Sequence, residues 1–122
     1  MTTFPARTLA RLRASRMLGI RAGHEHRFTG IWFVVVGGRV FVKPWNDGAE
    51  GWRQAFRKDP RGAISVGSKE IRVRARPVRG TKIHEAIDAA YAGKYSTKAS
   101  QKWVRGFRTA KRRRTTVELL PR

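Results

Sequence analysis

The stretch GIWFVVVGGRVFVKPWNDG, residues 30–48, holds two apolar runs joined by Gly37 and Gly38. The first run, 30–36, is almost continuously apolar and rich in valine and aromatic residues, which is typical of a strand covered on both faces. A connection of two glycines can take the positive φ angles of a tight turn. The stretch therefore predicts an antiparallel hairpin that ends in a polar turn at 46–48.

Further elements follow on both sides of this hairpin. Before it, Pro5 suits the first turn of a helix, and the pattern predicts a short basic helix over 5–16 and a strand over 18–25. After it, Trp52 and Phe56 are spaced for a short helix that Asp59 and Pro60 end. The remaining predicted elements are strands at 63–66, 70–78 and 115–121, a helix at 81–95 and a helical turn at 98–107.

The predicted strands are short, two pairs of them are hairpins, and the helices do not alternate regularly with them. This order favours a small antiparallel split β-barrel with peripheral helices, a mainly β (α+β) fold, over a doubly wound sheet. We expect a single domain overall, in which residues 1–17 form a basic N-terminal helix and residues 18–122 form the barrel.

Composition excludes several classes of protein. The 122 residues include no cysteine, which removes disulfides and thiolate chemistry and fits a reducing compartment. No apolar run approaches the roughly 18 residues that a membrane span needs, and arginines interrupt the N-terminal region. We therefore expect a cytoplasmic protein that does not enter a membrane.

Positive charge dominates the composition, with 28 basic and 8 acidic residues and a net charge of +20. Such a field attracts polyanions and phosphorylated small molecules. The segment 102–114 is basic and aromatic and contains no acid, so its aromatic side chains can stack on bases among arginines. This alternative nucleic-acid interface consists of Trp103, Arg105, Phe107, Arg108, Arg112, Arg113 and Arg114.

No arrangement of nucleophile, base and orienting group emerges from the sequence, and there is no P-loop, dinucleotide fingerprint or His-Glu-x-x-His helix. His24 and His26 share a face in an extended chain, but two ligands do not make a metal site, so no metal is predicted. A reaction at this protein would therefore depend on a bound cofactor. A barrel that binds nothing small and serves as a partner protein is a further reading.

The order of motifs resembles a small bacterial family of unknown function. The motifs are GHEHRFTG, WFVVVGGRVFVKPWNDG, GWRQAF, DPRGAISVG, ARPV and VELLP, and they cover roughly residues 18–121. That family is similar to the deazaflavin-dependent nitroreductase group of the FMN-binding split β-barrel superfamily. The resemblance implies a flavin- or deazaflavin-dependent reductase that binds FMN or a deazaflavin in a groove beside the strands. It also implies a homodimer, because split-barrel relatives usually pair.

The resemblance assigns roles by position. Arg27 and Thr29, in and after the basic turn, would contact the cofactor phosphate, because a guanidinium and a hydroxyl donate hydrogen bonds to it. Trp45, Asn46 and Asp47 would lie beside the bound ring. Relatives carry small polar residues there, so the indole of Trp45 either stacks on a flavin, fills the groove or packs at the barrel end.

Tyrosines of the helical region help to bind substrate or donate a proton in the nitroreductase relatives. By this resemblance Tyr95 is the candidate catalytic residue. Tyr91 falls on the apolar stripe of the predicted helix at 81–95 and is expected in the core.

Overall fold

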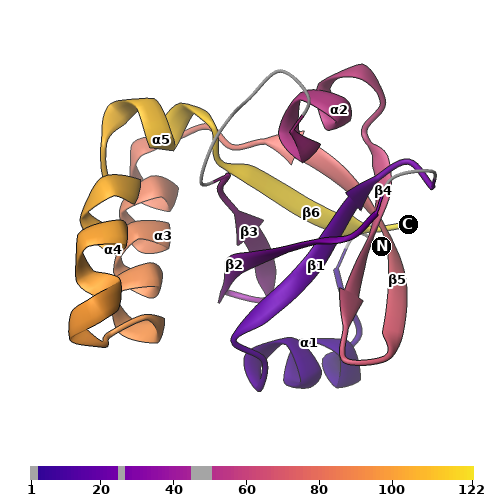
Figure 1. The fold of residues 1–122 in the computed structure, drawn as a ribbon, viewed down its shortest axis with the longest axis horizontal. Helices are drawn as coiled ribbons and strands as arrows, with labels where there is room; N and C mark the ends of the chain where they lie inside the picture. The colour runs from indigo at the N-terminus through magenta and orange to yellow at the C-terminus, as the bar shows by residue number, and fades with distance from the viewer. Residues whose placement is uncertain (1–2, 25–26, 45–50) are drawn as a thin grey trace.

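A closed barrel of six antiparallel strands forms the centre of the computed structural model, which describes residues 3–24, 27–44 and 51–122. The strands follow one another around the barrel in the order β1-β2-β3-β6-β5-β4 (Figure 1). The predicted antiparallel barrel with peripheral helices is confirmed. The strands are β1 (Met17–Ala22), β2 (Thr29–Val36), β3 (Arg39–Val42), β4 (Arg61–Val66), β5 (Lys69–Pro77) and β6 (Val117–Pro121).

The predicted two-glycine hairpin joins β2 to β3. Gly37 and Gly38 take φ angles of 57° and 77°, and Val36 pairs with Arg39 across the turn. Two consecutive positive φ angles match the twist of the flanking strands, which is why glycine suits this turn. The second predicted hairpin, β4 to β5, turns at Gly67, whose φ angle is 61°.

Helices lie around the barrel on three sides (Figure 1). One short helix lies at each end of the barrel, and three helices stand together beside β2 and β3. No helix of the described residues lies over β1, β4 and β5 on the side opposite that group. The helices are α1 (Ala6–Arg13) at one end, α2 (Trp52–Lys58) at the other, and α3 (Thr81–Lys94), α4 (Gln101–Phe107) and α5 (Ala110–Arg114) in the group, with a 3-10 turn over Lys98–Ser100.

Two apolar clusters account for the burial of β2 on both faces. Phe33 points into the barrel, where Leu12 of α1 and Phe56 of α2 close the core at its two ends. Val34 points outward and packs with Tyr91 of α3 and other residues of the helical group. The sequence prediction that this strand is covered on both faces is therefore confirmed.

Two carboxylates, Asp88 and Glu118, and one ammonium group, that of Lys43, are charged groups buried in the described structure. Asp88 of α3 accepts hydrogen bonds from Lys43, which follows β3, and from Arg113 of α5. Glu118 of β6 accepts hydrogen bonds from Arg39 and Arg76, which lie on the neighbouring strands β3 and β5. Each carboxylate thus has charged partners, as buried ions require.

No helix in the described part of the chain combines the length and the apolar character that a membrane span requires.

Candidate functional site

Helix α2 closes one end of the barrel because Gly62 of β4 lets it approach. A methyl group at Gly62 would lie 2.2 Å from the carbonyl oxygen of Arg21 and 2.6 Å from the ring of Phe56. Phe56 therefore packs over a position that has no side chain. Trp52 meets Phe56 edge to face, with ring centroids 6.2 Å apart. The two sides of α2 border two separate hollows.

The first hollow, called here the Arg27 cavity, has a volume of about 240 Å³. Arg21 and Ala22 of β1, Thr29 of β2 and Trp52 of α2 form much of its wall. Arg27 and Thr29, which the sequence analysis names as the phosphate contacts, both line this cavity. The full lining is Ile20, Arg21, Ala22, Arg27, Thr29, Trp52 and Ala55.

Two guanidiniums give the Arg27 cavity its charge. Arg21 pairs with Glu70 and lies over the ring of Phe28, 4.4 Å from the centroid. Its Nε is buried and has no hydrogen-bond partner among the described residues. Arg27 is exposed and forms no ion pair with a described residue. Because a guanidinium donates strong hydrogen bonds to anions, the exposed Arg27 makes the cavity favourable for an anion.

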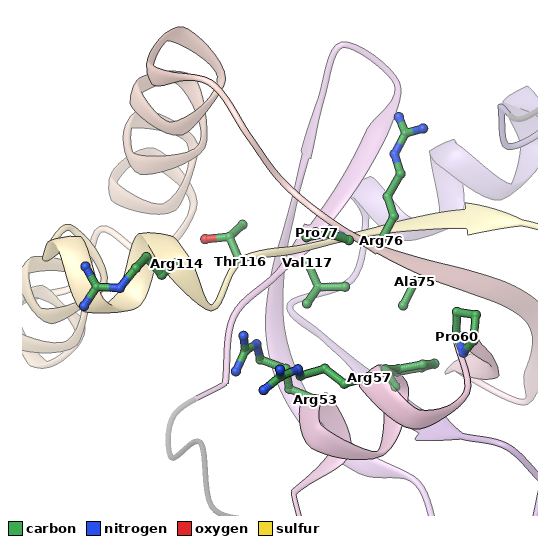
Figure 2. Close-up of a pocket in the computed structure, with 10 residues that line it drawn as sticks. Arg53, Arg57, Pro60, Ala75, Arg76, Pro77, Arg114, Thr116 and Val117 are labelled. Carbon is green, nitrogen blue, oxygen red and sulfur yellow. The ribbon is translucent and has the colours of Figure 1, made fainter.

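The second hollow, called here the Arg53 cleft, has a volume of about 350 Å³ (Figure 2). It lies on the other side of α2, against the paired ends of β5 and β6. Its floor is apolar and its edges carry arginines. The lining consists of Arg53, Phe56, Arg57, Pro60, Ala75, Arg76, Pro77, Arg114, Thr116 and Val117.

The other predicted cofactor contacts, Trp45, Asn46 and Asp47, lie outside the described residues. Tyr95, the candidate catalytic residue, is fully buried. Its hydroxyl accepts from the backbone NH of Phe33 and lies within hydrogen-bond distance of the backbone oxygens of Phe33 and Arg16, which share its single proton. Burial raises the pKa of Tyr95 to about 12. This position favours a structural role for Tyr95 over contact with a substrate.

Only some residues of the alternative nucleic-acid interface are exposed at the protein surface. Phe107 is buried in the helical cluster, where its ring packs on Tyr91, and cannot stack on a base. Arg113 is paired with Asp88, and Arg112 donates to the backbone oxygen of Pro44. Phe107 is therefore enclosed by protein, while Arg112 and Arg113 are half-buried and already hold these partners. The remaining members, Trp103, Arg105, Arg108 and Arg114, are exposed.

The sequence analysis did not identify the other residues that line the cavity with Arg27. Alternation along β1 turns Arg21 away from the barrel core, but nothing in the local sequence indicates that it lines one cavity with Trp52 of α2. The same is true of Arg53 and Arg57, which the sequence shows only as basic residues of a short helix. No group of three potential metal ligands occurs among the residues that the structure describes.

Solved structures with the same fold come from several bacteria. A putative pyridoxamine 5'-phosphate oxidase from Listeria innocua is 13% identical, with a TM-score of 0.59 over 95% of this chain and 90% of its own. A conserved hypothetical protein from Mycobacterium tuberculosis is 15% identical, with a TM-score of 0.57 over 98% and 80%. At these identities the likeness shows the fold alone.

A heme-binding protein from Mycobacterium smegmatis is 14% identical, with a TM-score of 0.50, and this chain spans about half of it, 52%. No curated protein is similar enough to the chain to count as a match. The family described as "Uncharacterized protein conserved in bacteria (DUF2255)" matches residues 8–119. This match spans nearly the whole barrel and its helices, and the chain belongs to that family.

Proposed function

We propose that the protein binds FMN or a deazaflavin, with the phosphate in the Arg27 cavity, and acts as a flavin- or deazaflavin-dependent oxidoreductase. The observation that carries this proposal is the meeting of Arg21, Arg27, Thr29 and Trp52 around one hollow. The names of two proteins with this fold, a putative pyridoxamine 5'-phosphate oxidase and a heme-binding protein, add support by analogy.

The residues of the Arg27 cavity suit a phosphate. Guanidinium groups and a hydroxyl donate to phosphate oxygens, and Arg27 and Thr29 bring one of each to the cavity. At about 240 Å³ the cavity is smaller than the roughly 300 Å³ at which pockets for whole drug-sized ligands begin. It therefore fits the phosphate end of the cofactor and leaves the tricyclic ring outside. When bound, the cofactor would supply hydride transfer, and the chain would supply binding and orientation.

The test of this proposal is binding of FMN and of a phosphate-bearing deazaflavin by calorimetry and thermal unfolding. Ligand that binds the native state raises the melting temperature by mass action. We expect Arg27→Gln to weaken binding about tenfold, because a charge-assisted hydrogen bond is lost. Arg13→Gln removes the same charge from α1, at the opposite end of the barrel from α2, and is the matched control (Figure 1). Absence of binding by both cofactors, or equal losses in the two variants, would contradict the proposal.

We also propose that two chains pair, as the resemblance implies. On the side opposite the helical group, no helix of the described residues covers β1, β4 and β5, which leaves sheet surface for a second copy (Figure 1). Light scattering on the purified protein tests this, and a monomer at micromolar concentration contradicts it.

Nucleic-acid binding is the second candidate, because one observation favours it. Trp103 is 48% exposed on α4, and Arg105 and Arg108 are exposed beside it in the chain. An exposed indole among cations suits stacking on a base. Trp103→Ala should then reduce the affinity for single-stranded DNA or RNA with no change in the salt slope, which depends on the charges alone.

A further inference from the structure

We propose that the outer face of β5 binds the phosphate backbone of a nucleic acid through a row of three arginines, called here the β5 strip. The strip consists of Arg72, Arg74 and Arg76. Its binding does not depend on the proposed cofactor, because none of these residues lines the Arg27 cavity. It is also a different surface from α4, since β5 lies on the side of the barrel away from the helical group (Figure 1).

Strand alternation directs the three arginines away from the barrel core. Val73 and Ala75, which lie between them, belong to the core cluster, and all three arginines are exposed. Side chains two positions apart on one face of a strand are about 6.6 Å apart. Because β5 is paired with β4 on one side and with β6 on the other, this spacing is held by two ladders of hydrogen bonds. The strip is therefore a regular row of cations on a rigid support.

Arg72 and Arg74 are the available cations of the strip. Neither side chain has a hydrogen bond or an ion pair with a described residue. Arg76 donates to Glu118, a carboxylate that it shares with Arg39. Phosphate contacts are therefore expected first from Arg72 and Arg74, and Arg76 adds to the positive potential.

The acids near the strip are paired with other arginines. The register places Arg61 of β4 opposite Arg74, and Asp59 forms an ion pair with Arg61. Glu70, at the start of β5, is paired with Arg21. Each of these carboxylates thus has a guanidinium of its own, and the charge of the strip remains uncompensated by them.

The chemistry of the strip favours a row of phosphates over other occupants. A guanidinium presents a planar fork of donors that matches phosphate oxygens, and a nucleic-acid strand carries one negative charge per nucleotide in a regular row. The core of a protein interface is apolar, whereas the outward residues of β5 from 70 to 76 are all charged. A second copy placed over the strip would bring arginine against arginine, which repel. The occupant is therefore a phosphate backbone.

The test is fluorescence anisotropy of a short labelled DNA duplex titrated with the purified full chain at several salt concentrations. Arg72→Gln with Arg74→Gln should weaken binding about tenfold or more at physiological salt. The slope of log affinity against log salt should fall by about 1.8, because each lost phosphate contact removes about 0.9. Both side chains are exposed, so the variant should keep the urea midpoint of the wild type.

Two further measurements show what the strip recognises. Arg72→Lys with Arg74→Lys retains both charges and should retain the salt slope. Duplexes of different sequence should bind equally, since contacts to the backbone carry no sequence information. A strong preference for one sequence, or equal affinity for poly-glutamate or for vesicles of anionic lipid, would overturn the proposal.

Matched variants locate the contact. Arg7→Gln with Arg11→Gln removes two exposed charges from α1, at one end of the barrel, and should leave the salt slope unchanged (Figure 1). Equal losses in this variant and in the strip variant would show a net-charge effect. A larger loss with Arg105→Gln and Arg108→Gln would place the nucleic acid on α4. Either result would overturn the proposal, and neither depends on whether FMN binds.

Discussion

The hydroxyl of Tyr95 lies 3.0 Å from both the backbone nitrogen and the backbone oxygen of Phe33. It also lies 2.5 Å from the backbone oxygen of Arg16, and the ring stacks on Trp32 with centroids 4.0 Å apart. One side chain thus joins the end of α3 to β2 and to the segment before β1. The hydrogen bonds and ring packing of Tyr95 therefore help to hold the helical group against the barrel.

Removing this hydroxyl tests the link. Tyr95→Phe should lower the free energy of unfolding by about 1–3 kcal/mol, because a buried NH of Phe33 loses its acceptor. Tyr91→Phe is the matched comparison, since the hydroxyl of Tyr91 lies farther from its acceptor on β2, 3.4 Å from the backbone oxygen of Trp32. Urea unfolding at neutral pH measures both. Equal losses in the two variants, or no loss in Tyr95→Phe, would contradict the structural role.

The buried ion pair of Asp88 and Lys43 gives a second prediction. Lys43 Nζ lies 3.4 Å from Asp88 Oδ1 and donates to the backbone oxygen of Phe107 at 2.9 Å. Burial lowers the pKa of Lys43, and Asp88 opposes that shift. Asp88→Asn should destabilise the fold by about 3 kcal/mol or more, because a buried cation loses its counter-charge.

An exposed carboxylate provides the control for Asp88. Asp59 pairs with Arg61 on the surface, at 3.1 Å, so Asp59→Asn should change the urea midpoint little. If Asp88→Asn were as mild as Asp59→Asn, the buried network would not hold α3 and α5 to the barrel.

Local patterns in the sequence account for the elements that it predicted. Both hairpins could be predicted from their glycine turns. Helix α2 could be predicted from the spacing of Trp52 and Phe56 and from Asp59-Pro60 at its end. Each of these signals lies within a few neighbouring residues. Helix α5 lacks such a signal. Its sequence, AKRRR, has no apolar stripe, and it is held by the Thr109 cap and by the bond from Arg113 to Asp88. That bond spans 25 positions and is not visible in a local pattern.

The candidate site also combines residues that a local motif identifies with residues that only tertiary packing brings in. Arg27 and Thr29 were assigned through a motif, whereas Arg21 and Trp52 join them only through the close approach of α2 at Gly62. Trp103 and Phe107 share the i, i+4 spacing of one helix face, yet one is 48% exposed and the other is buried. Only the packing of α4 against α3 and the barrel decides which ring reaches solvent.

A pH-dependent stability follows from Lys94. Its Nζ donates to the backbone oxygen of Phe33 at 3.0 Å, and burial, with Arg16 nearby, lowers the pKa of Lys94 to about 8. An unfolded lysine has a pKa of about 10.4, so between these values the unfolded chain binds more protons. Stability should therefore rise from about pH 8 to pH 10. Above about pH 10 the raised pKa values of Tyr91 and Tyr95 reverse the trend.

Thermal unfolding at a series of pH values compares Lys94→Met with Lys82→Met, an exposed position on the same helix. Lys94→Met should reduce the rise and leave the part that the lowered pKa of Lys43 contributes, and Lys82→Met should keep the full rise. A rise of unchanged size in Lys94→Met would assign the effect to another group.

The last prediction concerns the residue that seats α2. Gly62→Ala places a methyl group 2.2 Å from the carbonyl oxygen of Arg21 and 2.6 Å from the Phe56 ring, so the strand and the helix must move apart. We expect a loss of about 1–3 kcal/mol in the free energy of unfolding. Because Trp52 and Ala55 of α2 line the Arg27 cavity, the affinity for the cofactor should fall as well.

Gly93→Ala is the matched control for Gly62. Gly93 lies in α3 with nothing within 4 Å of the added methyl group, so alanine should stabilise the helix by about 0.5–1 kcal/mol. Opposite signs of the two substitutions in urea unfolding would show that the close approach, and not glycine's flexibility, sets the requirement at Gly62. If Gly62→Ala were neutral, α2 could not be held against β4 as described, and the walls of both hollows would lie elsewhere.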